Sequence, residues 1–444
     1  VGSEMCIRDS DSTEGIAQIT SRFAPPLAPT LSGYIRLMSA LSLWLNNFTP
    51  LYSAHTRTYL AGQSVSMIGI WLQQTAMALL VYQLSGGQAF ALGVSALCSS
   101  LPILLLSMFT GALADRYDRR KLLIGCHLVE IALTLAIASM IHAEQVQLLH
   151  IYVFAFLMGC VNSVYFPTQQ AFLFDLAGMD NIRKLISINS MILNICRTLG
   201  PTLAGYLVAQ VGMSVAFWAN GMSYWVVIFS LISLHAVRQS RPKAGESVSL
   251  GEAVAHIRHT LTLRNIYICC AALTMFGLGS LALLPAVAHG DPQLTGLLLG
   301  AAASGSLVYA VFLSPVISYI KRMGLTLSLT LVWMGSWLVV SALTEWLYLQ
   351  LLALFMFGLA TSQAMVTCTS MVQILSPVAM RGRLMGLFSI IGFGLQPLAT
   401  LIAGFMADRM GVAATIALWG LVAVTIASGL LAQSQWREWS LARD

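Results

Sequence analysis

The chain has 444 residues, of which 57% are hydrophobic and only 9% are charged. Soluble domains normally carry about 25% charged residues, so this composition excludes a water-soluble fold and predicts an all-α membrane protein embedded in a lipid bilayer. The net charge of +6 does not indicate a nucleic-acid partner, because the basic residues lie in short loops between apolar runs. The eight cysteines have neither disulfide nor metal-ligand spacing, and we expect no metal and no cofactor.

The first 55 residues form an N-terminal segment that we expect to be partly disordered or non-native. Its opening, VGSEMCIRDSDSTEG, is polar and lacks the apolar core of a signal peptide. Residues 31–50 are weakly amphipathic, and we consider them a candidate helix on the membrane surface.

Twelve apolar runs follow, and each is long enough to cross a bilayer as a helix, which takes about 20 residues. The first six cover residues 59–83, 89–114, 121–142, 148–174, 182–210 and 213–236, and the last six cover 264–288, 294–320, 325–343, 347–375, 382–408 and 412–433. We therefore predict an N-terminal six-helix half at 56–236, a linker with a short amphipathic helix at 237–263, a C-terminal six-helix half at 264–433 and a tail at 434–444.

The distribution of basic residues predicts the orientation of these twelve helices. When the N terminus is placed in the cytoplasm, 21 of the 23 Lys and Arg residues fall on the cytoplasmic side, as the positive-inside rule requires. Arg409 falls outside and Arg197 lies within a helix. We expect a multi-pass protein of the bacterial cytoplasmic (inner) membrane, with both termini and the linker in the cytoplasm.

The two halves also repeat one another. A shift of 199 residues places LAGYLVAQVG (203–212) on IAGFMADRMG (402–411). Two similar six-helix halves joined by a linker are typical of secondary transporters. The predicted fold is therefore twelve transmembrane helices in two pseudo-symmetric halves.

The loop between the second and third helices reads GALADRYDRRKL (111–122) and resembles the 2–3 loop signature of the major facilitator superfamily. The stretches at 62–86, 165–178, 189–207 and 381–389 are similar to its enterobactin-exporter and multidrug-exporter branch. The resemblance covers about residues 55–430. It implies transport by alternating access, with a substrate cavity between the halves.

The resemblance also implies a cytoplasmic gate in which Asp115 faces the N terminus of the eleventh helix, where a helix dipole attracts a carboxylate. The alternative is that this loop only sets the topology. The matching loop of the second half has Ser318 in place of an aspartate, so we expect a one-sided gate. The gate candidates are Gly111, Asp115, Arg116, Arg119, Arg120, Lys121, Asp175, Arg381 and Arg383.

The fifth helix matches part of the exporter motif G-P-x-x-G-G. Gly200, Pro201 and Gly205 fit the motif, whereas Ala204 replaces one glycine. Small residues allow close helix approach and proline bends a helix, so these three residues are hinge candidates.

Ionisable residues inside membrane helices are costly and are functional candidates by default. Arg197 is a candidate for binding an anionic cargo or for coupling by switching partners during transport. The alternative is a fixed structural ion pair or hydrogen bonds to helix carbonyls. Glu130 lies about nine residues into the third helix, roughly 14 Å deep, with His127 one turn earlier. It is predicted either to couple transport to protons or to form a buried pair with His127.

Polar side chains on the first, fourth and tenth helices are candidates for cargo contact, because the resemblance places helices 1, 4, 7 and 10 around the cavity. Asn194 joins them because it lies on the same face of the fifth helix as Arg197. The alternative is hydrogen bonding between helices. The substrate-binding candidates are Trp71, Gln73, Gln74, Asn162, Tyr165, Gln169, Asn194, Arg197, Gln363 and Thr367.

The sequence thus predicts a monomeric secondary transporter, with a small molecule and protons as partners. The expected function is proton-coupled export of a siderophore, a drug or another amphipathic molecule. The alternatives are an importer or a lipid or lysophospholipid flippase on the same fold, and a non-transporting receptor or scaffold. An enzyme is not expected, because the chain has no catalytic motif such as HExxH, GxSxG or a phosphate loop.

Overall fold

The computed structural model describes residues 49–234, 250–314, 322–377 and 380–439, with the surroundings of Gly111 and the side chains of Asp115, Arg183 and a few others excepted. The predicted surface helix at 31–50 and Ser318 therefore lie almost entirely outside the described residues. The described parts of the chain contain helices and no strand. The prediction of an all-α membrane protein is confirmed.

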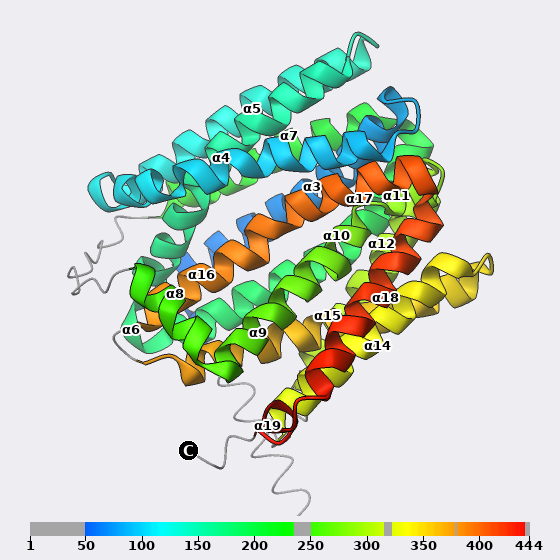
Figure 1. Cartoon of the computed structure of the whole chain (residues 1–444). Coiled ribbons are helices and arrows are strands. Elements are labelled where there is room, and N and C mark those ends of the chain that lie inside the picture. Colours follow the sequence, from blue (N-terminus) through cyan, green and yellow to red (C-terminus); the bar gives the residue numbers. More distant parts are fainter. Residues whose placement is uncertain (1–48, 235–249, 315–321, 378–379, 440–444) are drawn as a thin grey trace, which may run out of the picture.

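The N-terminal half consists of η1 (Thr49–Tyr52), α3 (Ala54–Leu84), α4 (Ala89–Arg116), α5 (Arg119–His142), α6 (Leu148–Val211) and α7 (Met213–Ser233). A short helix, α8 (Leu250–His259), lies where the sequence predicts an amphipathic helix in the linker. Figure 1 shows these helices in blue to green, stacked against the helices of the second half.

The C-terminal half is broken into more pieces. It contains α9 (Leu261–Ala272), η2 (Leu273–Leu278), α10 (Gly279–Leu281), α11 (Leu284–Val287), α12 (Pro292–Val308), η3 (Tyr309–Leu313), α14 (Met323–Leu343), α15 (Leu347–Leu375), α16 (Arg381–Ser389), η4 (Ile390–Gly394), α17 (Leu395–Met410), α18 (Val412–Leu431) and α19 (Ser434–Arg437). The segments η2, η3 and η4 are π-helical turns, which insert an extra residue into a helix and locally bend it.

Helix α6 departs from the sequence prediction of two helices with a break between residues 174 and 182. Its 64 residues are helical throughout, and a straight helix of that length would measure about 96 Å, some three times the hydrocarbon thickness of a bilayer. The predicted break between residues 174 and 182 is wrong, because these residues are helical in the structure.

Packing nevertheless shows that α6 crosses the molecule twice. Phe154 and Val208 belong to one apolar cluster with the C-terminal part of α3, and Phe172 and Leu185 belong to another cluster with the N-terminal part of α3. Helix α6 must therefore fold back between residues 173 and 185. Eleven described helices are long and apolar enough to span a membrane, and the returning part of α6 makes the twelfth pass, as predicted.

The helices define two ends of the molecule. The turn end carries the short connections at residues 85–88, 143–147, 212, 344–346 and 411, and the linker end carries η1, α8 and the loop at 117–118. The close contacts between the halves lie toward the turn end. There α4 crosses α17, where a Cβ added to Gly93 would lie 2.4 Å from Leu401 Cα, and α6 crosses α12.

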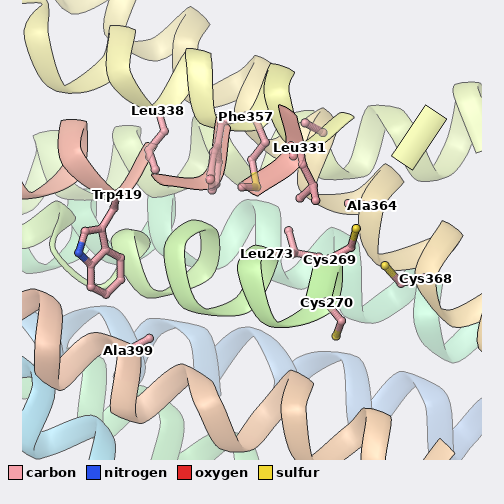
Figure 2. Close-up of a cluster of buried hydrophobic side chains, with 14 of the residues drawn as sticks. Cys269, Cys270, Leu273, Leu331, Leu338, Phe357, Ala364, Cys368, Ala399 and Trp419 are labelled. Carbon is pink, nitrogen blue, oxygen red and sulfur yellow. The ribbon is translucent and has the colours of Figure 1, made fainter. Parts of the chain in front are cut away.

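The core of the C-terminal half is apolar and rich in sulfur (Figure 2). Cys269 and Cys270 on α9 and Cys368 on α15 are fully buried free thiols, and they pack with Leu331 and Phe357 in one cluster. Buried thiols of this kind behave as small apolar side chains. Apolar packing therefore fills the centre of this half, and a few hydrogen bonds between helices, such as that from the hydroxyl of Tyr267 to the carbonyl of Leu384 at 2.7 Å, add to it.

Candidate functional site

A buried ion pair joins α5 to α6 at the linker end. Asp118 caps α5 by accepting a hydrogen bond from the backbone N–H of Lys121 at 3.0 Å, which places Arg119 at the first helical position. Arg119 Nη1 donates to Asp175 Oδ1 at 2.8 Å and Oδ2 at 2.7 Å, and the two side chains are only 4% and 1% exposed. Both members belong to the N-terminal half, so this pair stiffens that half.

The remaining gate candidates are spread over the same end. Arg120 Nη2 donates to the carbonyl of Ile232 on α7 at 2.6 Å, and Arg381 Nη2 to the carbonyl of Ser376 at 3.5 Å. Arg116, Lys121 and Arg381 are exposed, and Arg383 is half-buried. The surroundings of Gly111 and the side chain of Asp115 are not among the described parts of the structure. The attraction of Asp115 to the eleventh helix stays a prediction.

The three hinge candidates lie at close helix crossings. A Cβ added to Gly200 would lie 2.2 Å from the Cβ of Trp71 on α3, and one added to Gly205 would lie 2.3 Å from the carbonyl oxygen of Pro292 on α12. The carbonyl oxygen of Pro201 would lie 2.6 Å from a Cβ on Gly296. Thus α6 touches the C-terminal half with almost no side chain between the backbones. Bending at this crossing stays a prediction.

Arg197 lies one turn before Gly200 and is half-buried. Its guanidinium carbon is 5.8 Å from the centre of the Trp71 ring, within the range of a cation–π contact. No carboxylate of the described residues forms an ion pair with Arg197. The structure therefore brings two substrate-binding candidates, Arg197 and Trp71, together, and the Arg197 guanidinium contacts an aromatic ring instead of a carboxylate.

A second polar cluster lies inside the N-terminal half. His127 Nδ1 and Glu130 Oε2 on α5 are 2.8 Å apart, and their side chains are 2% and 4% exposed. The ring of His127 lies 5.2 Å from the ring of Tyr165 and 5.5 Å from that of Tyr224. The pairing of His127 with Glu130 expected from the sequence is present. A role of this pair in proton coupling stays a prediction.

Two amides complete this cluster. Gln63 Nε2 donates to the hydroxyl of Tyr165 at 2.8 Å. Gln63 Oε1 and Gln169 Nε2 are buried and have no hydrogen-bond partner among the described residues. Because buried polar atoms are normally satisfied, this is a polar interior with unused hydrogen-bonding capacity.

The other substrate-binding candidates divide into two groups. Gln73 accepts a hydrogen bond from Asn220 Nδ2 at 2.8 Å, and Asn194 Nδ2 donates to the carbonyl of Ser190 at 2.8 Å, so both have partners within the N-terminal half. Gln74 is exposed, Asn162 and Gln363 are half-buried, and Gln169 and Thr367 are buried.

Sequence reasoning missed two polar contacts. One is the buried Asn220, which also donates to the hydroxyl of Tyr224 at 3.1 Å. The other is Asp408, whose carboxylate accepts hydrogen bonds from the backbone N–H groups of Ala89 and Phe90 in the opposite half. The only signal for Asp408 in the sequence is a carboxylate near the end of a helix, which is not specific.

Comparisons with known proteins agree with this architecture. The family model described as transmembrane secretion effector (MFS_3) matches residues 45–442. The staphyloferrin A transporter of Staphylococcus aureus is 25% identical over 383 residues, covering 84% of this chain and 94% of the relative. The enterobactin exporter EntS of Citrobacter koseri is 25% identical over 405 residues, covering 87% and 94%. The multidrug efflux pump Tap of Mycolicibacterium fortuitum is 22% identical over 343 residues, covering 74% and 83%.

Solved structures show the same fold. The crystal structure of the nucleoside transporter NupG has a TM-score of 0.68 at 12% identity, covering 86% of this chain and 99% of NupG. The family match spans most of the chain, and the described helices make the twelve passes of this fold. The chain belongs to the transmembrane secretion effector family of major facilitator superfamily transporters, and it is a membrane transporter and not an enzyme.

Proposed function

We propose that this transporter exports an amphipathic small molecule with an anionic group, such as a siderophore, from the cytoplasm in exchange for protons. The observation that carries the proposal is the contact of Arg197 with Trp71. An arginine inside a membrane is expensive unless it has a partner. Because the partner of Arg197 is only an aromatic ring, the N–H groups of the Arg197 guanidinium are free to bind a carboxylate or another oxyanion.

The neighbouring aromatic ring fits the amphipathic part of such a cargo. Trp71 offers an apolar face beside the cation, so one molecule with an acidic group and a flat apolar part can use both. The described C-terminal half adds no charged side chain in the middle of a helix, because its charges lie at helix ends such as Asp291 and Arg322. The names of the relatives, a staphyloferrin A transporter and an enterobactin exporter, support this chemical class.

For proton coupling we propose the His127–Glu130 pair. The pair holds a carboxyl and an imidazole at 2.8 Å in a buried site, and both kinds of group can accept and release a proton. The unused hydrogen-bonding atoms of Gln63 and Gln169 lie in the same polar interior and offer places for a water that carries a proton.

For the orientation we propose that the linker end faces the cytoplasm. The basic side chains of that end, Arg119, Arg120, Arg381 and Arg383 among them, support it through the positive-inside rule. The structure has its close contacts between the halves at the turn end, so the linker end is where a cavity would open in this state.

Transport into everted membrane vesicles tests the proposal. With staphyloferrin A, enterobactin and the cation ethidium as probes, we expect at least one siderophore to accumulate when respiration acidifies the lumen, and accumulation to stop with a proton uncoupler. Accumulation in right-side-out vesicles instead would overturn export. Preference for ethidium over both siderophores would overturn an anionic cargo.

Variants separate the two roles. Arg197→Gln is expected to lose siderophore uptake at least tenfold through a higher KM, and Arg197→Lys to keep part of it. Glu130→Gln is expected to lose uptake driven by the pH gradient but to keep exchange of labelled for unlabelled cargo. Arg322→Gln, at an exposed end of α14, is the matched control and should transport normally. Normal gradient-driven uptake by Glu130→Gln would assign coupling elsewhere.

A further inference from the structure

The first turn of α4 is stabilised by the opposite half of the molecule. Helix α4 starts at Ala89 after Gln88, and Gln88 makes no side-chain cap. The first N–H groups of a helix have no partner within it. Here Asp408 Oδ1 accepts from the N–H of Ala89 at 2.7 Å and Oδ2 accepts from the N–H of Phe90 at 3.0 Å. Asp408 lies near the C-terminal end of α17.

The corresponding helix of the second half solves the same problem differently. Helix α12 is capped by Asp291, the residue directly before it, which accepts from the N–H of Leu294 at 2.7 Å. The shift of 199 residues places Ala209, which has no hydrogen-bonding side chain, at the position of Asp408. One half therefore caps its helix internally, whereas the other depends on a carboxylate that is 319 residues away in the chain.

Close backbone packing holds Asp408 in place. A Cβ added to Gly404 would lie 2.5 Å from the carbonyl oxygen of Ala89, so α17 and α4 touch there without intervening side chains. Phe90 and Phe405 add an edge-to-face contact at 6.3 Å between ring centres. These contacts form only while the two halves meet at the turn end.

We propose that Asp408 is a latch that holds the turn end of the transporter closed by capping α4 from the opposite half. When the halves separate there, both hydrogen bonds break and α4 loses its cap. Because Asp408 is exposed, water takes over its hydrogen bonds as the end opens, so the latch is reversible. The positive end of the α4 dipole attracts the carboxylate of Asp408.

Distance measurements between the halves test the latch without requiring transport, so their failure is distinct from a failure of the proposed function. Spin labels at Gln145→Cys and Glu345→Cys, two exposed positions in turn-end loops of opposite halves, report the opening by pulsed electron paramagnetic resonance. Cys6, Cys98 and Cys160 are replaced by serine so that only these two sites are labelled.

In Asp408→Ala we expect the ratio of open to closed molecules to rise about fivefold, which corresponds to an N-cap of ordinary strength. Asp408→Asn keeps one acceptor oxygen and should give a smaller rise. Asp291→Ala is the matched control, because it removes the same kind of cap within one half, and its distance distribution should equal that of the unmodified protein.

Two results would overturn the latch. One is an unchanged distance distribution in the Asp408→Ala variant when that variant elutes as a monodisperse protein. If Asp408→Ala does not fold, an unchanged distance distribution in Asp408→Asn would overturn the latch instead. The other is an equal shift in Asp291→Ala, which would mean that any weakened helix start opens the molecule.

Discussion

The two halves of this transporter share a chain path but differ in what fills them. The shift of 199 residues places Asp175, in a buried ion pair with Arg119, on Ile374, which is 54% exposed. It also places Asn220, which donates to Gln73, on Trp419, which is 3% exposed and packs against Phe276 at 5.5 Å between ring centres. Equivalent helix positions are thus polar in one half and apolar in the other.

This difference teaches that the duplicated topology does not depend on any particular interior chemistry. Helices of suitable length pack in the same order whether ion pairs or thiols and aromatic rings lie between them. Among the described residues, the N-terminal half has the buried ionisable pairs and the C-terminal half has all three π-helical turns. The buried charged contacts of the described residues thus lie in the first half, and the irregular helical turns lie in the second.

The largest effect is expected at the ion pair of the N-terminal half. Arg119→Ala removes the buried cation that pairs with the carboxylate of Asp175, and breaking a buried ion pair by removing one member typically costs about 3–5 kcal/mol. We expect a corresponding fall in the free energy of unfolding, measured by SDS titration of the purified protein in detergent. Arg322→Ala, an exposed arginine at the start of the corresponding helix α14, should change it by less than about 0.5 kcal/mol. Equal effects would contradict the difference between the halves.

A smaller effect is expected in the apolar core of the C-terminal half. Trp419→Ala leaves a cavity beside Phe276 and Gly279. In soluble proteins such a change costs about 3–5 kcal/mol, but lipid is as apolar as the core, so mainly the packing loss remains and we expect roughly 2–3 kcal/mol. The same titration measures it. Trp419→Phe, which retains a ring, should recover about half of the loss; no recovery would argue against packing as the cause.

The smallest effect is expected at the position in the N-terminal half that matches Trp419. Asn220→Ala removes the hydrogen bond to Gln73, and hydrogen bonds between membrane helices average about 0.6 kcal/mol and reach about 1.7. A double-mutant cycle with Gln73→Ala isolates this interaction. A coupling energy near zero would show that the contact between Asn220 and Gln73 does not stabilise the protein, and that the polar side chains of this half are incidental to its stability.

Much of the fold could be predicted from hydropathy patterns among residues that are close together in the sequence. The twelve apolar runs and the short turns at Gly212 and Gly411 are local features, because helix length and the left-handed backbone of these glycines need no distant partner. The pairing of His127 with Glu130 is local for the same reason, since residues three apart share a helix face. The helical bend of α6 was not predictable, because apolar patterns do not report the backbone of a short connection.

The sequence by itself therefore determined a membrane-spanning, duplicated, all-helical chain and where its few charged residues lie along the helices, because hydropathy and periodicity are properties of contiguous residues. Only the tertiary structure decided which partners those charges meet: Asp175 for Arg119, Trp71 for Arg197 and the start of α4 for Asp408. These contacts join residues from 56 to 319 positions apart. They depend on how the helices cross. The crossings are set by close approach of the backbones at glycine residues, and no local sequence pattern encodes them.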